Sequence, residues 1–194
     1  SIPKNDRMMI HMQRFIHIYD FLKQKDYRYV VSTDVRDVIF QSNPFDYLEN
    51  KFDSMYTKGL LASSEAIKIQ DEEWNRDNIR KNFGDYFYDI IKTNQVCNVG
   101  ILAGTPGAMK ELCFYLYQFS INRPDWVADQ AAYNVLLGTM TWGSKAHITE
   151  LSDAWAVNAH VTNKPDLVEK LKPYLLEEAP TMSKDGLIVN SNGN

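Results

Sequence analysis

The sequence predicts an α/β fold, and three observations support this prediction. Residues 29–31 form a short apolar run rich in aromatic and β-branched residues, as in a buried strand. Residues 96–104 carry apolar residues on both faces, which is typical of a strand covered on both sides. Amphipathic helical patterns lie before, between and after these runs. With 194 residues, the chain has the length of one domain, so we expect a single domain over residues 1–194.

Composition excludes several classes of function. The net charge of −4 provides no basic surface for nucleic acid, so we expect no nucleic-acid partner. No apolar run approaches the roughly 20 residues that cross a membrane, and the opening SIPKNDR does not resemble a signal peptide. We expect a cytoplasmic protein, or the soluble catalytic part of a longer protein. In the second case this chain is truncated at one or both ends. Cys97 and Cys113 lack C-x-x-C spacing, which favours packed thiols over a metal or disulfide role.

The first elements follow from apolar spacing and helix caps. Residues 6–24 predict a helix, because apolar side chains recur there at steps of three and four. Residues 27–33 predict a strand, and Asn43-Pro44 predicts the start of a helix that ends near residue 50. The predicted apolar stripe of the first helix consists of Met8, Met12, Phe15, Ile16, Tyr19 and Leu22.

The rest of the chain alternates predicted strands and helices. Thr105-Pro106 predicts a helix start, and the final residues 185–194 predict a hairpin whose second strand is missing. Strands are predicted over residues 54–57, 60–69, 96–104, 147–151 and 153–161. Helices are predicted over residues 71–92, from residue 105 to a break at residues 122–125, and over residues 126–137 and 164–176.

An acidic stretch follows the first predicted strand. Asp34 and Asp37 stand at the carboxyl end of a buried strand, where two acids are costly without a partner. Ligands bind at this end of open α/β sheets. A divalent cation with a sugar-nucleotide diphosphate is a suitable partner, because hard cations bind carboxylate and phosphate oxygens together. The alternative is an acid-rich turn that closes the strand.

Two further stretches place polar residues in apolar surroundings. Asn98 interrupts a buried strand and needs hydrogen-bond partners, while Gly100 permits close approach of a ligand or backbone. A β-bulge pinned by Asn98 would explain the same pattern. Asp129 and Gln130 occupy the first turn of a predicted helix, where the helix dipole favours a carboxylate without any catalytic role. Glu65 lies in a mixed segment and is either a loop acid or a site residue.

Three phrases, in this order, resemble glycosyltransferases with the GT-A fold, particularly the retaining, glycogenin-like nucleotide-diphospho-sugar transferases. They are STDVRDVIFQSNPF (residues 32–45), the N-x-G-hydrophobic-hydrophobic-x-G pattern of residues 98–104, and the D-Q-x-x-x-N pattern of residues 129–134. The resemblance implies a mixed, mostly parallel sheet flanked by helices. It also implies transfer of a hexose from a nucleotide sugar (a UDP- or GDP-sugar) to a carbohydrate or other hydroxyl acceptor, with Mn²⁺ or Mg²⁺ as cofactor.

The same resemblance implies a role for each candidate residue. In the family, a basic residue on the preceding helix contacts the donor phosphates, and Arg14 resembles it. The implied donor-binding residues are Arg14, Asp34, Arg36, Asn98 and Gly100, the metal ligands Asp34 and Asp37, the catalytic residues Asp129 and Gln130, and the acceptor-side residue Glu65.

The sequence departs from the family at the second acid, which normally stands two residues after the first. Arg36 occupies that position, so either Asp37 reaches the cation or Arg36 supplies positive charge to the diphosphate. Two alternatives share the fold: a catalytically degenerate module that binds nucleotide sugars, and a sugar nucleotidyltransferase. A haloacid-dehalogenase-type phosphatase is disfavoured, because its Asp-x-Asp-x-Thr pattern would need an acid at Arg36 and a threonine at Val38.

Overall fold

The structure is a computed structural model of the chain. It describes residues 10–24, 26–35, 38–40, 43–53, 59–139, 144–149, 156–158, 169, 181–182 and 188–189. Within these residues, no helix combines the length and the apolar character needed to cross a membrane.

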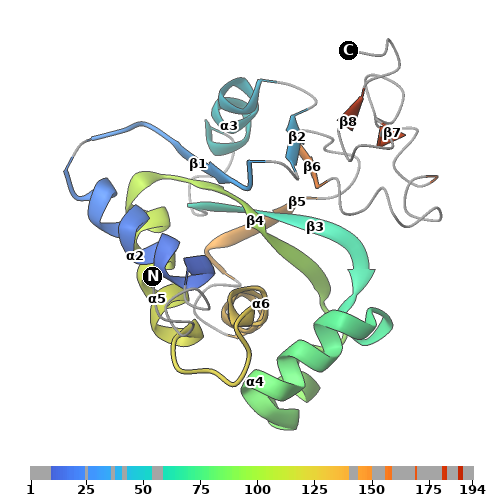
Figure 1. Ribbon diagram of the computed structural model, residues 1–194. Coiled ribbons are helices and arrows are strands. Elements are labelled where there is room, and N and C mark those ends of the chain that lie inside the picture. The colour runs from blue at the N-terminus through green and yellow to red at the C-terminus, as the bar shows by residue number, and fades with distance from the viewer. Residues whose placement is uncertain are drawn as a thin grey trace.

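A four-stranded sheet forms the centre of the fold (Figure 1). Its strand order is β1 (Val30–Thr33), β4 (Gln95–Gly104), β3 (Leu60–Lys68) and β5 (Ala146–Thr149). Strand β4 is antiparallel to both of its neighbours, whereas β3 and β5 are parallel. The α/β class and the mixed sheet are therefore confirmed.

The prediction of a mostly parallel sheet is wrong, because among the described strands only the β3–β5 pair is parallel. The apolar runs that suggested a parallel sheet reflect burial on both faces of the strands. Burial on both faces produces the same continuous apolar pattern in a central antiparallel strand as in a parallel one. Strand β4 is such a strand, since it lies between β1 and β3 with apolar residues packed on either side.

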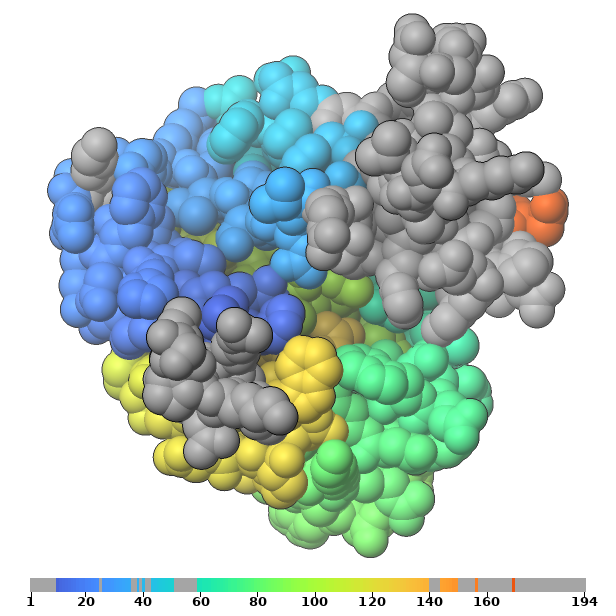
Figure 2. Space-filling view, in the orientation of Figure 1, coloured from blue at the N-terminus to red at the C-terminus, as the bar shows by residue number. Residues whose placement is uncertain are grey.

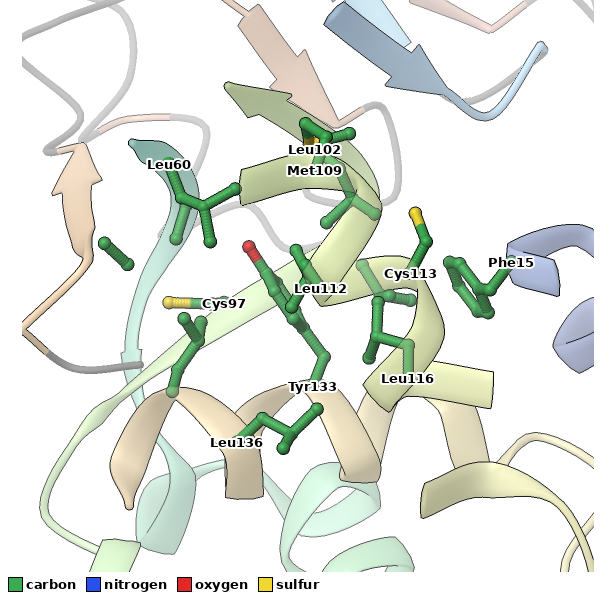
Figure 3. Close-up of a cluster of buried hydrophobic side chains, with 14 of the residues drawn as sticks. Phe15, Leu60, Cys97, Leu102, Met109, Leu112, Cys113, Leu116, Tyr133 and Leu136 are labelled. Atoms are coloured by element: carbon green, nitrogen blue, oxygen red, sulfur yellow. The ribbon is translucent and has the colours of Figure 1, made fainter. Parts of the chain in front are cut away.

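Three helices cover one face of the sheet: α2 (Ile10–Leu22), α5 (Pro106–Ser120) and α6 (Ala128–Gly138). Of the stripe predicted for α2, Met12, Phe15 and Leu22 are buried. The core below the sheet is built around the fully buried Tyr133, with Phe15 and the residues of α5 beside it (Figure 3). These helices confirm the three predicted helical patterns.

The opposite face is covered by α3 (Pro44–Asp53) and by a two-stranded ribbon of β2 (Val38–Phe40) and β6 (Ala156–Asn158). The alternation of side chains along the strands separates the two cores. Leu61, Ile101 and Ala103 face Leu48 of α3, whereas Leu60, Ala62 and Leu102 face α5 and α6. Asn43 caps α3 as predicted, because its side-chain oxygen accepts a hydrogen bond from the Phe45 amide at 3.0 Å.

Helix α4 (Glu73–Ile91) follows a short 3-10 helix, η1 (Ile69–Asp71), and packs against α6. It confirms the helix predicted over residues 71–92, with one interruption. Gly84 has a φ of 81° inside the helix, a left-handed value that glycine adopts without steric cost. The first turn of α4 borders the cavity described below.

The predicted strand over residues 54–57 lies outside the described residues, as does the predicted helix over residues 164–176 apart from residue 169. Near the end of the chain, β7 (Thr181–Met182) pairs antiparallel with β8 (Ile188–Val189). The prediction that the final hairpin lacks a strand is therefore wrong. The partner of residues 188–189 precedes them in the chain, and the two-residue strand at 181–182 was too short to show a pattern in the sequence.

Candidate functional site

A cavity of about 430 Å³ opens where α2, the first turn of α4, the start of α6 and the sheet meet. Figure 2 shows this side of the molecule, with α2 in blue, the segment before α6 in yellow and α4 in green. Every predicted site residue that the structure describes lines the cavity, namely Arg14, Asp34, Glu65, Asn98, Gly100, Asp129 and Gln130. The other two, Arg36 and Asp37, lie outside the described residues.

Arg14 connects three segments of the chain at this cavity. Its Nη1 donates to Oδ1 of Asp34 at 2.5 Å, and its Nη2 donates to Oδ2 of Asp129 at 3.0 Å. The guanidinium also lies 4.7 Å from the centre of the Phe15 ring. Its Nε is buried and has no hydrogen-bond partner among the described residues. The charge of Arg14 therefore compensates two carboxylates that come from different elements.

Asp129 is a nearly inaccessible acid, with 2% of its surface exposed. It occupies the first turn of α6, and its Oδ1 accepts a hydrogen bond from the Gln130 amide at 3.0 Å. Burial raises the pKa of the Asp129 carboxyl, and the neighbouring Arg14 guanidinium acts in the opposite direction. The cavity thus holds a desolvated carboxylate whose charge depends on one arginine.

Gln130 and Asn134 attach α6 to the strand that forms the cavity wall. Oε1 of Gln130 accepts from the Val99 amide at 2.9 Å, and its Nε2 donates to the Cys97 carbonyl at 3.0 Å and to Oδ1 of Asn75 at 3.3 Å. Asn134 accepts from the Cys97 amide at 2.9 Å and donates to the Cys97 carbonyl at 3.0 Å. The Gln130 side chain is therefore fully hydrogen-bonded within the protein, which favours a positioning role for it.

Asn98 holds Glu65 at the cavity. Its Nδ2 donates to Oε1 of Glu65 at 2.8 Å, and its Oδ1 accepts from the Gly100 amide at 2.7 Å. The next residue, Ala66, has a φ of 54°, and the β3–β4 register shifts between Ser64 and Lys68. Such bulges re-aim side chains, and a left-handed alanine persists only where its surroundings hold it. This local geometry turns the buried Glu65 carboxylate toward the cavity.

Gly100 makes room for the Asp34 carboxylate. The Asp34 amide donates to the Gly100 carbonyl at 2.8 Å, which holds the loop after β1 against β4. A Cβ atom at Gly100 would lie 2.5 Å from Oδ2 of Asp34 and 2.8 Å from Oδ1 of Asn98. These separations are shorter than van der Waals contact, so only glycine fits here without displacing both side chains.

The charges around the cavity suit a hard cation that prefers oxygen ligands. Among the described residues, four carboxylates line it, those of Asp34, Glu65, Glu72 and Asp129, together with the guanidinium of Arg14. Carboxylate oxygens are the ligands that Mg²⁺ and Mn²⁺ prefer. The described residues contain no cluster of three or more His, Cys, Asp or Glu side chains that could hold a metal, and Asp37 lies outside them. Asp34 fits a metal ligand, since its carboxylate is 35% exposed at the cavity.

Several lining residues were not predicted from the sequence. His11 lies three residues before Arg14, so the two share a face of α2, and this spacing was visible in the sequence. Glu72 caps α4 by accepting from the Asn75 amide at 2.7 Å. Glutamate is not among the residues preferred at N-caps, so the sequence carried no clear signal for this cap. Trp74 and Val127 gave no signal either, because only the tertiary fold brings them to the cavity.

No protein-family model matches this chain, and no curated protein matches it either. The chemistry of the cavity must therefore be read from its own side chains.

Proposed function

We propose that the protein transfers a hexose from a nucleotide-diphosphate sugar to a carbohydrate or other hydroxyl acceptor, with a divalent cation and with retention of configuration. One observation carries this proposal. Residues from three phrases that are far apart in the sequence, around Asp34, Asn98 and Asp129, line one cavity together with Arg14 and Glu65. Convergent polar groups in a cavity are the usual mark of a ligand site.

The charges of the cavity support a donor that binds together with a cation. A bare diphosphate would be repelled by the carboxylates, whereas a cation on Asp34 offsets that repulsion. Mn²⁺ or Mg²⁺ would supply a Lewis acid that stabilises the negative charge on the departing diphosphate. Arg14 can contribute to the same task, because a guanidinium binds phosphate oxygens well and its Nη1 already donates to Asp34 at the cavity.

The remaining residues have roles at the sugar. The buried Asp129 carboxylate would stabilise the positive charge that develops at the anomeric carbon, and a fixed charge in a desolvated site is effective for this purpose. Gln130 holds β4 in place through the Val99 amide and the Cys97 carbonyl. Glu65, which Asn98 orients, would accept a hydrogen bond from the acceptor hydroxyl.

A second candidate is a module that binds nucleotide sugars without turnover. The observation in its favour is the double ion pair of Arg14, which already compensates the carboxylates of both Asp34 and Asp129. Turnover distinguishes the two candidates. A transferase releases the nucleoside diphosphate when donor and acceptor are present, whereas a binding module leaves the nucleotide sugar intact.

The test is a thermal-shift measurement with a panel of UDP- and GDP-sugars, with and without Mn²⁺. We expect at least one nucleotide sugar to raise the melting temperature of the wild type only when Mn²⁺ is present. The rise in melting temperature should disappear in Asp34→Asn. It should persist in the control variant Asp20→Asn, which changes an exposed acid of α2 that pairs with Lys23. A rise that survives Asp34→Asn unchanged would contradict the proposed site.

A further inference from the structure

A second cavity of about 550 Å³ adjoins the first. The two share Glu72 and Trp74 in their walls, and Trp74 stands at the boundary between them. The Trp74 side chain is large and apolar, yet 50% of its surface is exposed. Exposed aromatic rings beside a polar cavity are the usual means by which proteins bind a partner that is apolar on one side and polar on the other.

The backbone that carries Trp74 is firmly held. Glu72 caps the helix by accepting from the Asn75 amide at 2.7 Å and from the Asn75 Nδ2 at 2.9 Å. Oδ1 of Asn75 in turn accepts from Nε2 of Gln130 at 3.3 Å. The backbone at Trp74 is therefore held by the same hydrogen-bond network that positions the wall of the first cavity, so binding against the indole would require little ordering of the backbone.

The charges around the second cavity are mostly compensated. Arg76 pairs with Asp77 at 2.9 Å and lies 3.8 Å from Glu73, and Lys81 pairs with Asp125 at 2.8 Å. Compensated carboxylates attract a cationic peptide weakly, yet their free lone pairs still accept hydrogen bonds from hydroxyl groups. An anionic chain would meet more carboxylates than cations here and would be repelled.

We propose that the second cavity is a subsite for an uncharged oligosaccharide acceptor. One sugar ring lies with its C–H face on the Trp74 indole, its hydroxyls donate to Glu73 and Asp77, and the next ring extends past Glu72 into the first cavity. The direction in which the oligosaccharide lies rests on the proposed glycosyl transfer, because the reacting hydroxyl must enter the cavity that holds Asp129. The proposal makes Trp74 a specificity-determining residue for the acceptor.

The experiment measures binding by isothermal titration calorimetry with four probes: maltohexaose, cellohexaose, hexagalacturonate and hexalysine. We expect a neutral hexasaccharide to bind the wild type, and Trp74→Ala to weaken this binding about tenfold. Tyr86→Ala is the matched control, because it removes an aromatic ring that is 74% exposed on the same helix but outside the cavity. It should bind as the wild type does. Trp74→Phe keeps an aromatic face and should fall between the two.

Three results would overturn the proposal: no neutral hexasaccharide binds, binding is unchanged in Trp74→Ala, or only hexalysine or hexagalacturonate binds.

Circular dichroism establishes that each variant is folded. Measuring the Mn²⁺-dependent shift by nucleotide sugars in Trp74→Ala separates this proposal from the previous one. A retained nucleotide-sugar shift without Trp74-dependent oligosaccharide binding contradicts the subsite alone. Trp74-dependent binding without any nucleotide-sugar shift in the wild type supports the subsite and contradicts the proposed donor.

Discussion

Arg14 of α2 donates a hydrogen bond to Asp129 of α6 at 3.0 Å, although 115 residues separate the two in the chain. The same guanidinium binds Asp34 beyond the end of β1. Helix, strand and helix are thus joined at the cavity by one side chain. Because the Asp129 carboxylate is almost completely buried, its charge needs compensation, and this arginine is the largest favourable influence on it.

Replacing Arg14 should therefore destabilise the protein. In Arg14→Gln the buried Asp129 loses its counter-charge, and we expect the free energy of unfolding to fall by about 2–4 kcal/mol. Urea denaturation followed by circular dichroism measures this change. Arg80→Gln, which removes an exposed arginine that pairs with Asp85, is the control and should have little effect. Equal stability of the two variants would show that the Arg14 pairs contribute nothing.

Replacing Gly100 should abolish donor binding while the fold survives. The Cβ of Gly100→Ala would displace the Asp34 carboxylate, so the Mn²⁺-dependent thermal shift by nucleotide sugars should be lost. Gly107→Ala is the matched control, because a Cβ at Gly107 on α5 meets no atom within 4 Å. It should keep the shift and gain up to about 1 kcal/mol from helix propensity. Donor binding that persists in Gly100→Ala would count against Asp34 as the metal ligand.

The pH dependence of stability should report on Asp129. Burial raises its pKa above the ordinary 3.8, so the native state binds more protons than the unfolded chain between 3.8 and the raised value. Its stabilising contribution is complete below 3.8 and is lost as the pH rises through the folded pKa. Asp129→Asn cannot titrate. Its free energy of unfolding should therefore decline less than that of the wild type as the pH rises above 3.8, as measured by urea titrations at a series of pH values.

Asp125 provides a control of opposite sign. The hydrogen bond from Lys81 lowers the pKa of Asp125 below its ordinary 3.8. Its contribution is present above 3.8 and is lost as the pH falls through the folded pKa, so Asp125→Asn should alter only the acid end of the curve. Identical profiles for Asp129→Asn and the wild type would contradict the raised pKa of Asp129.

Gln130 should behave as a positioning residue, so its replacement should first lower the free energy of unfolding. Gln130→Ala leaves the buried Val99 amide without its acceptor and removes one of the hydrogen bonds to the Cys97 carbonyl. This loss should lower the free energy of unfolding by about 1–3 kcal/mol. Gln70→Ala, at an exposed glutamine, is the control and should be near neutral. If Gln130→Ala loses turnover at wild-type stability, Gln130 instead contacts the substrate.

The two thiols should be inert in the folded protein. Cys97 and Cys113 are free and buried, and burial raises the pKa of each to about 12. Because the thiolate is the reactive form, neither should react with Ellman's reagent near pH 8. After unfolding in guanidinium, both should react rapidly. Fast labelling of native protein would show that one of the thiols is accessible.

The sequence was a good guide to element type and to several residues that line the cavity. Apolar periodicity predicted α2, and apolar residues on both faces predicted β4. A polar amide in a buried strand drew attention to Asn98, whereas Asp129 was singled out by the D-Q-x-x-x-N resemblance and by its place in the first turn of a predicted helix. Strand direction was not predictable, because a strand covered on both faces has the same apolar pattern in either direction. The full hydrogen bonding of Gln130 and the exposure of Trp74 were equally hidden, since both depend on contacts between distant segments.

The side-chain amides of Gln130 and Asn134 have one more consequence. They satisfy the backbone groups of Cys97 and Val99 that an adjacent strand would otherwise engage. Open backbone groups along a strand are templates on which a second molecule can add by sheet extension, a common route to aggregation. By occupying these groups with side chains, α6 protects this end of β4 from self-association while leaving the cavity beside it open to ligands.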